Sequence, residues 1–136
     1  MNNDDKKYLA LTRCERADQL LDAAKMLLEG NDYKSANNRA FYCAEMAIKA
    51  ALAVIGKSGD THNGILKTFN MEFIHKKSPY FSTSDYKILT GMGRIRQASD
   101  YDDFYIANKA ECETQVKDAE VILEKVKSYL TAENIL

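Results

Sequence analysis

The chain has few of the residues that interrupt helices or build metal and disulfide frameworks. Its 136 residues include no tryptophan, one proline, Pro79, and six glycines. Because proline and glycine most often end a helix, this scarcity favours long helices over a loop-rich fold. The three cysteines, Cys14, Cys43 and Cys112, are an odd set without CxxC spacing. We therefore expect reduced thiols in the core of a cytoplasmic protein.

Charge and hydrophobicity exclude several function classes. Lysine and arginine number 19 against 20 for aspartate and glutamate, so the formal net charge is −1. The chain thus lacks the basic excess that drives non-specific nucleic-acid binding, and any contact with RNA has to be local. No apolar run reaches the length of a membrane span, and the amino terminus, MNNDDKKY, does not resemble a signal peptide. We expect a soluble protein without membrane contact.

Metal and nucleotide chemistry have little support in the sequence. The two histidines, His62 and His75, are not at metal-ligand spacing. Three aspartates, Asp100, Asp102 and Asp103, fit solvated turn residues better than a magnesium site. There is no P-loop, GxGxxG or GxSxG motif. We predict no metal site and no cofactor.

The segment from Asp32 to Ile55 predicts the helix around which the rest of the chain is organised. From Ala40 onward, only Glu45 and Lys49 interrupt its apolar run. Small residues follow one face at helical spacing, at Ala36, Ala40, Cys43, Ala44, Ala47 and Ala51. Such a face lets neighbouring helices approach closely. Arg39 lies at the edge of this apolar zone, where we expect a carboxylate partner.

Three further helices follow from periodic apolar residues and capping signals. The first runs from about Asp4 to Glu29 and forms an antiparallel hairpin with the central helix. Another begins after Thr61 and carries apolar residues as far as Ile74. The last follows Asn108, with a glutamate three residues later that resembles a capping box.

The remaining helix is predicted to begin near Ser82, with Ile88, Leu89, Met92 and Ile95 pointing inward. Gly91 and Gly93 weaken it unless a partner backbone passes close by. The tract from Ser99 to Tyr105, SDYDDFY, is predicted to break the helical pattern. With no strand signal, the sequence predicts a single all-α domain over residues 1–136, an antiparallel up-and-down bundle of about five helices.

Three segments in order resemble the HEPN domain superfamily, specifically its small stand-alone bacterial and archaeal members. They are NRAFY at Asn38–Tyr42, THNG at Thr61–Gly64 and RQASDYDDFY at Arg96–Tyr105. The resemblance implies a helical bundle that commonly dimerises. It also implies a minimal nucleotidyltransferase as partner in a toxin and antitoxin pair, in which the toxin is a metal-independent ribonuclease.

The chain departs from the nuclease-type members of that superfamily at one position. Those members carry an arginine followed, four to six residues later, by a histidine. Arg96 fills the first place, but no histidine follows it. An unconventional ribonuclease would then depend on Arg96 for the phosphate, Asp100 as proton acceptor and Tyr101 to orient the phosphate.

A structural role for the same segment is the favoured interpretation. Residues 94–105 contain two arginines and three aspartates, a local charge that does not attract a polyanion. In this interpretation Arg96 or Arg39 pairs with Asp100, and the tyrosines pack against the central helix with their hydroxyls satisfied.

The resemblance also suggests candidate residues for a protein interface or for covalent modification. It implies that a tyrosine close to the motif can be nucleotidylated by the partner, which makes Tyr101 and Tyr105 candidate targets. Tyr42, Asp102 and Asp103, together with Arg39, are further candidates for an interface.

Three function classes follow from these observations. The favoured one is an interaction module, a homodimer that pairs with a minimal nucleotidyltransferase in a toxin-antitoxin-like system. The second is a ribonuclease toxin with a degenerate active-site motif. The third is a helical bundle that binds a nucleotide or another small ligand.

Overall fold

The computed structural model describes all 136 residues, and every regular element in it is helical. The elements are α1 (Asn3–Glu29), α2 (Tyr33–Val54), α3 (His62–Phe69), the π-helix η1 (Asn70–His75), α4 (Thr83–Tyr101) and α5 (Lys109–Ala132). The predicted all-α bundle of about five helices is confirmed.

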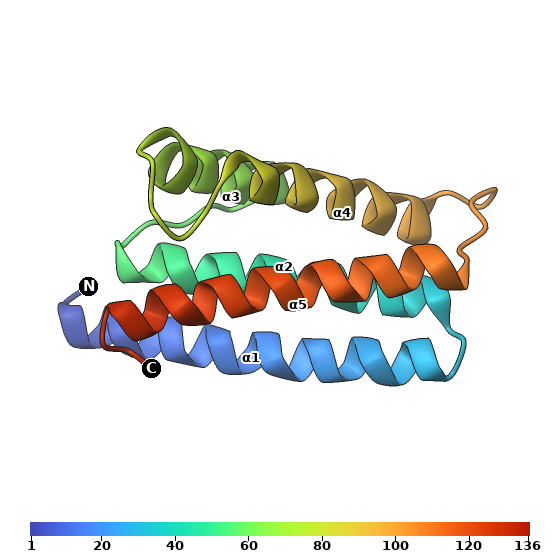
Figure 1. Cartoon of the computed structure of the whole chain (residues 1–136), viewed down its shortest axis with the longest axis horizontal. Coiled ribbons are helices and arrows are strands. Elements are labelled where there is room, and N and C mark those ends of the chain that lie inside the picture. Colours follow the sequence, from blue (N-terminus) through green and yellow to red (C-terminus); the bar gives the residue numbers. More distant parts are fainter.

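Helix α2 is the common neighbour of the other α-helices. Figure 1 shows α1 on one side of the bundle, α2 and α5 in the middle, and α3 with α4 on the other side. Helix α2 contacts all four, whereas α1 and α4 do not touch. Both chain termini lie at one end of the bundle. The turns α1–α2 and α4–α5 lie at the opposite end.

The small residues predicted to line α2 are fully buried. The side chains of Ala36, Ala40, Ala44, Ala47 and Ala51 have no solvent exposure. Because each carries only a methyl group, the backbones of neighbouring helices can come close to α2. The N-cap carboxylate of α2 accepts a hydrogen bond from the Ser35 amide at 3.3 Å. The predicted buried central helix is confirmed.

The third predicted helix is divided into α3 and the π-helix η1. The chain stays helical to His75, but its turns widen after Phe69. The ring of Phe73 in η1 packs against Phe69, Phe81 and Tyr129, with centroid distances of 5.7, 5.1 and 5.2 Å. Burial of this ring offsets the unfavourable geometry of a π turn. The apolar periodicity of the sequence does not indicate such a turn.

The buried face of α4 differs from the predicted one. Its buried residues are Asp85, Leu89, Met92, Arg96 and Ser99. Ile88 and Ile95, which were expected inside, are only half-buried. Leu89 and Met92 are buried as predicted, but a search for apolar residues misses the other three inward side chains because they are polar.

Polar contacts hold α4 against its neighbours. Asp85 is fully buried and accepts hydrogen bonds from the Ser82 amide at 2.8 Å and from Lys125 Nζ of α5 at 2.6 Å. Near the other end, Ser99 Oγ accepts a hydrogen bond from Asn37 Nδ2 of α2 at 3.1 Å. The break predicted over Ser99–Tyr105 is therefore confirmed only from Asp102, because α4 continues to Tyr101.

Helix α5 begins as predicted, although its capping box is incomplete. The Asn108 side chain accepts a hydrogen bond from the Glu111 amide at 2.8 Å. The reciprocal contact is missing, since Glu111 Oε1 is buried without a hydrogen-bond partner.

The three cysteines are free and buried, as expected of core thiols. Burial raises the pKa of Cys43 to about 12 and that of Cys112 to about 11. These thiols are therefore poor nucleophiles, because the thiolate is the reactive form.

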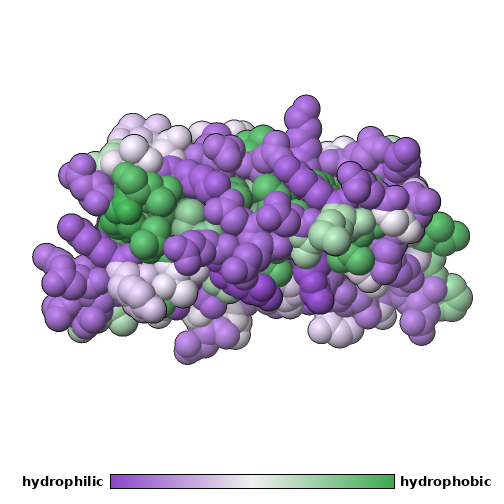
Figure 2. Space-filling view, turned by 90° about the horizontal axis from the view of Figure 1, so that it is seen from below, coloured by the Kyte–Doolittle hydropathy of each residue, from purple (hydrophilic) through white to green (hydrophobic).

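The face of the molecule on the α1 side is predominantly hydrophilic. Figure 2, seen from the α1 side, shows apolar patches separated by polar and charged side chains. None of the helices combines the length and the apolar composition needed to cross a membrane.

The close packing of α2 can be tested by enlarging its buried face. Ala47→Leu or Ala51→Leu should lower the free energy of unfolding by about 1 to 3 kcal/mol, because neither buried site has space for a larger side chain. Ala110→Leu, at an exposed position of α5, is the control. Chemical denaturation measures all three variants. Unchanged stability in both α2 variants would contradict the close packing.

Candidate functional site

The largest hollow in the molecule is a cleft of about 640 Å³ between α2, α3 and α4. Twelve residues line it: Phe41 of α2, His62, Asn63 and Leu66 of α3, Thr90, Gly93, Arg94, Arg96, Gln97, Ala98 and Tyr101 of α4, and Asp102 just after α4. Most of these side chains are polar, so the cleft suits a charged or hydrogen-bonding ligand.

Arg96 forms the inner wall of the cleft on α4. Its side chain is 8% exposed. The guanidinium carbon lies 5.2 Å from the ring centre of Phe41 and 5.8 Å from that of Tyr101. Both rings stabilise the cation and fix its position. Nε of Arg96 is buried and donates to no acceptor, so a hydrogen-bonding group remains available.

Asp100 is the carboxylate nearest to this arginine, which confirms the predicted pairing. Its Oδ2 lies 3.6 Å from Arg96 Nη1. Asn38 Nδ2 of α2 donates to both oxygens of Asp100, at 3.2 and 2.9 Å. Asp100 lines a separate hollow of about 370 Å³ together with Asn38 and Arg39, and it does not line the cleft.

The carboxylate partner expected for Arg39 is absent. Arg39 is exposed, and its Nη1 donates a hydrogen bond to Asn38 Oδ1 at 2.7 Å. An exposed guanidinium is solvated by water, so the reason for expecting an ion pair does not apply.

A histidine of α3 lines the cleft and is held from behind by a glutamate of α2 that does not line it. Thr61 caps α3 by accepting a hydrogen bond from the Gly64 amide at 2.9 Å, which places His62 in the first turn. His62 Nδ1 lies 2.5 Å from Oε2 of Glu45, whose side chain is 12% exposed. The imidazole also packs against Phe41 and Tyr42, at centroid distances of 5.3 and 5.8 Å.

Sequence reasoning missed this histidine as a member of the site. In the sequence, His62 was weighed as a metal ligand and was set aside because of its spacing from His75. The signal that could have found it was Glu45, a lone acid in the apolar run of α2, since a buried carboxylate requires a hydrogen-bonding or charged partner.

The ring of Phe41 contacts both His62 of α3 and Arg96 of α4. His62 and the Arg96 guanidinium both pack on it. Their helices are separated in sequence, yet both side chains line the same cleft. The structure thus gathers an oriented imidazole and a buried guanidinium at one site.

The charged residues that line the cleft are not the same set as those in residues 94–105 of the sequence. Arg94 and Arg96 line it together with a single aspartate, Asp102, whereas Asp100 and Asp103 do not. The lining therefore holds two arginines and one aspartate, although Asp100 lies 3.6 Å from Arg96 and offsets part of its charge.

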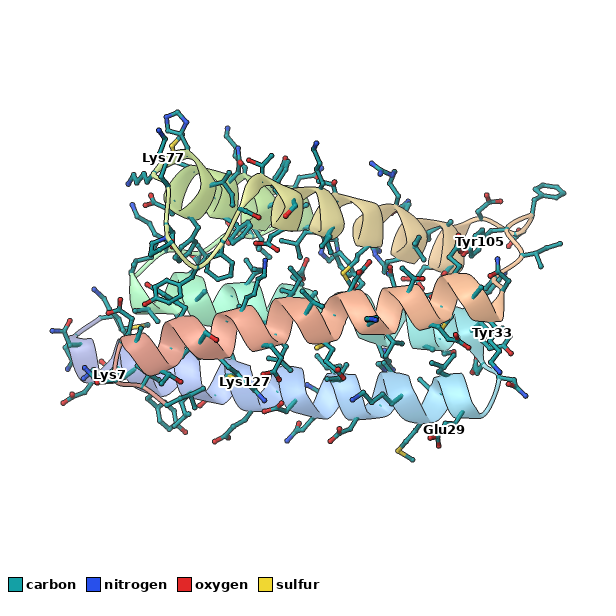
Figure 3. The ribbon with its side chains drawn as sticks, in the orientation of Figure 1. Lys7, Glu29, Tyr33, Lys77, Tyr105 and Lys127 are labelled. Carbon is teal, nitrogen blue, oxygen red and sulfur yellow. The ribbon has the colours of Figure 1, made fainter.

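The aromatic residues after Arg96 are not arranged as expected. Tyr101 is 69% exposed instead of packing against α2. The Tyr105 hydroxyl is buried without a hydrogen-bond partner. Figure 3 places Tyr105 at the same end of the bundle as Tyr33. Asp102 closes a turn by accepting a hydrogen bond from the Phe104 amide at 2.9 Å.

Comparison with known proteins identifies the family. The chain belongs to the HEPN domain family, whose model matches residues 10–129. This confirms the resemblance found in the sequence.

Relatives of similar length match across most of the chain. A protein of Methanocaldococcus jannaschii named "Putative toxin" is 30% identical over 122 residues, which cover 90% of this chain and 82% of the relative. A second protein of that organism with the same description is 28% identical, over 85% of this chain and 84% of its own. A UPF0332 protein of Thermotoga maritima is 28% identical, over 94% of this chain and 95% of its own.

The burial of Arg96 predicts a measurable role in stability. Arg96→Ala should lower the free energy of unfolding by about 1 to 3 kcal/mol, because it removes the contacts with two rings and the partner of Asp100. Arg39→Ala is the matched control and should change stability by less than about 0.5 kcal/mol. Thermal denaturation of both variants measures the difference. An Arg96→Ala variant as stable as the parent would show that Arg96 contributes nothing to packing.

Proposed function

We propose that this chain is the toxin of a toxin-antitoxin-like pair, in which a HEPN homodimer associates with a minimal nucleotidyltransferase. Membership of the HEPN family supports the proposal, as do two relatives whose names contain the word toxin. The structural observation that carries the partner-binding role is an exposed apolar loop beside the cleft.

This loop joins α4 to α5 and presents large apolar side chains to solvent. Phe104 is 94% exposed and Ile106 is 84% exposed, and Tyr101 at the end of α4 is also mostly exposed. Exposing such apolar side chains to water is unfavourable, so a partner that buries them gains binding free energy. Asp102 and Asp103 lie between them and favour a partner surface with basic residues.

Helix α4 supports the homodimer. A Cβ atom placed at Gly91 would have only Arg94 Nη2 near it, at 3.9 Å. Contacts within the chain therefore do not require a glycine at this position. Ile88 and Ile95 are half-buried beside the inward face of the same helix. An open glycine between apolar side chains allows a second helix to approach closely.

Exposure favours Tyr101 over Tyr105 as the tyrosine that the partner modifies. A nucleotidyltransferase must reach the hydroxyl, and Tyr101 is mostly exposed whereas the Tyr105 hydroxyl is buried. Tyr101 also lies at the rim of the cleft, beside Arg96.

The proposal requires a gene for a short nucleotidyltransferase beside the gene for this chain. When the two proteins are co-expressed, light scattering should give the mass of a complex that contains two copies of this chain. Changing Phe104 and Ile106 together to Ser should abolish capture of the partner, because both apolar anchors are lost.

The matched control changes two exposed apolar residues of α1, Tyr8 and Met26, to Ser. This variant should capture the partner as well as the parent does. A monomeric mass for the chain at micromolar concentration, or equal capture by the loop variant and the control, would contradict the proposal.

A further inference from the structure

We propose that a basic hollow between the start of α1 and the end of α2 binds a linear oligophosphate through Lys6, Arg13 and Lys57. Such a ligand carries two or three linked phosphate groups. The hollow has a volume of about 500 Å³ and shares no lining residue with the cleft. The inference goes beyond the proposed function, because neither the cleft nor the loop after α4 takes part in it.

The charged side chains that line the hollow are all cations. Lys6 and Arg13 come from α1, and Lys57 follows the end of α2. No aspartate or glutamate lines the hollow. Neither Lys6 nor Arg13 forms an ion pair with a carboxylate. Lys57 Nζ lies 3.9 Å from Glu72, which Lys76 holds more closely, at 2.7 Å. The hollow therefore attracts an anion.

Arg13 is the half-buried cation of this set. Its Nη1 donates a hydrogen bond to the backbone carbonyl of Lys49 in α2 at 3.1 Å, which fixes the guanidinium against that helix. Burial lowers the pKa of Arg13, and no carboxylate opposes the effect. Arginine nevertheless stays charged in proteins, and its guanidinium carries five N–H donors. The donors that Lys49 does not use can bind phosphate oxygens.

Lys6 is positioned by a glycine just after α2. Gly56 has a φ of +69°, in the left-handed region that favours glycine. A Cβ atom there would lie 3.1 Å from Cε and 3.2 Å from Nζ of Lys6. Because Gly56 has no side chain, the end of Lys6 can lie over the turn that follows α2. Arg13 and Lys6 thus contact two different parts of α2.

The spacing of these cations indicates the length of the ligand. Lys6 and Arg13 are two turns apart on α1, about 10 Å along its axis. One phosphate group is too small to contact both while Lys49 and Gly56 hold them apart, whereas linked phosphates reach both. No aromatic side chain lines the hollow, so a base would have no ring on which to stack. Recognition therefore depends on the phosphates.

A simpler role for the same cations is to offset the negative end of the α2 dipole. The last turn of α2 contains no basic residue, and Lys6 lies beside the turn that follows it. Loss of stability in a Lys6 or Arg13 variant fits both roles. Affinity for an added oligophosphate separates them, because cations that only stabilise a helix end give no saturable binding.

The experiment is calorimetric titration of the purified full chain with tripolyphosphate, in a low-salt buffer with EDTA. The parent should bind tripolyphosphate at least about tenfold more tightly than inorganic phosphate, because more cations are contacted. Arg13→Gln should weaken binding by about tenfold or more. Arg16→Gln is the matched control and should bind within about twofold of the parent. It removes the same charge from an exposed position of α1 outside the hollow.

Lys6→Gln provides a second variant that does not depend on the fold of Arg13→Gln. The Lys6 side chain exchanges no ion pair and contacts the flexible end of the hollow, so its loss should leave the fold intact and weaken binding by about fivefold or more. Circular dichroism of each variant shows whether it is folded.

Two further ligands distinguish the sources of the phosphates. Equal affinity for ATP and tripolyphosphate would support a ligand recognised by its phosphate chain alone, and tighter binding of ATP would support a nucleotide as the source. A short RNA with a 5′-hydroxyl tests a nucleic-acid backbone instead. No saturable binding of tripolyphosphate, equal affinity of Arg13→Gln and Arg16→Gln, or tighter binding of the RNA than of tripolyphosphate would overturn the inference.

Discussion

Close packing against the alanine face of α2 is the constraint on which the rest of the structure depends. The face has no solvent exposure, and α2 touches each of the other four α-helices. In a chain of this length, without disulfides, one central helix of small residues lets four others share a single core. The positions of the other four helices are therefore set by their contacts with α2.

The same helix brings the polar groups of the site together. Asn38, Phe41 and Glu45 are spaced three and four residues apart, so they lie on one face of α2. That face contacts Asp100 and Arg96 of α4 and His62 of α3. An alanine-rich face on one side and these three side chains on the other give α2 both a structural and a functional role.

Much of the fold was predictable from local signals. The periodicity of apolar residues predicted five helices, and capping residues predicted where most of them begin. Both signals lie within a few neighbouring residues, so they can be recognised without the tertiary structure. The apolar part of the inward face of α4, Leu89 and Met92, was predicted, but its polar part was not predictable in this way. Asp85, Arg96 and Ser99 are buried because Lys125, Phe41 and Asn37 meet them, and these partners lie far away in sequence.

The candidate site was predicted only in part, for a related reason. The sequence indicated Arg96 and its pairing with Asp100, which are four residues apart on one helix. The contact between Glu45 and His62 spans 17 residues and a turn between helices, so only the packed structure reveals it. A charge sum along the chain likewise does not show that Arg94, Arg96 and Asp102 line one cleft while Asp100 lines another hollow.

The central claim is that His62 and Arg96 line one ligand-binding site, and the chain's two histidines allow a direct measurement. The ring protons of His62 and His75 can be followed by NMR while a 2′-O-methyl dinucleotide is added. The account predicts saturable shifts of the His62 signals, unchanged His75 signals, and half-saturation at a much higher ligand concentration in Arg96→Gln. An unchanged titration curve in Arg96→Gln, or shifts at His75 alone, would contradict it.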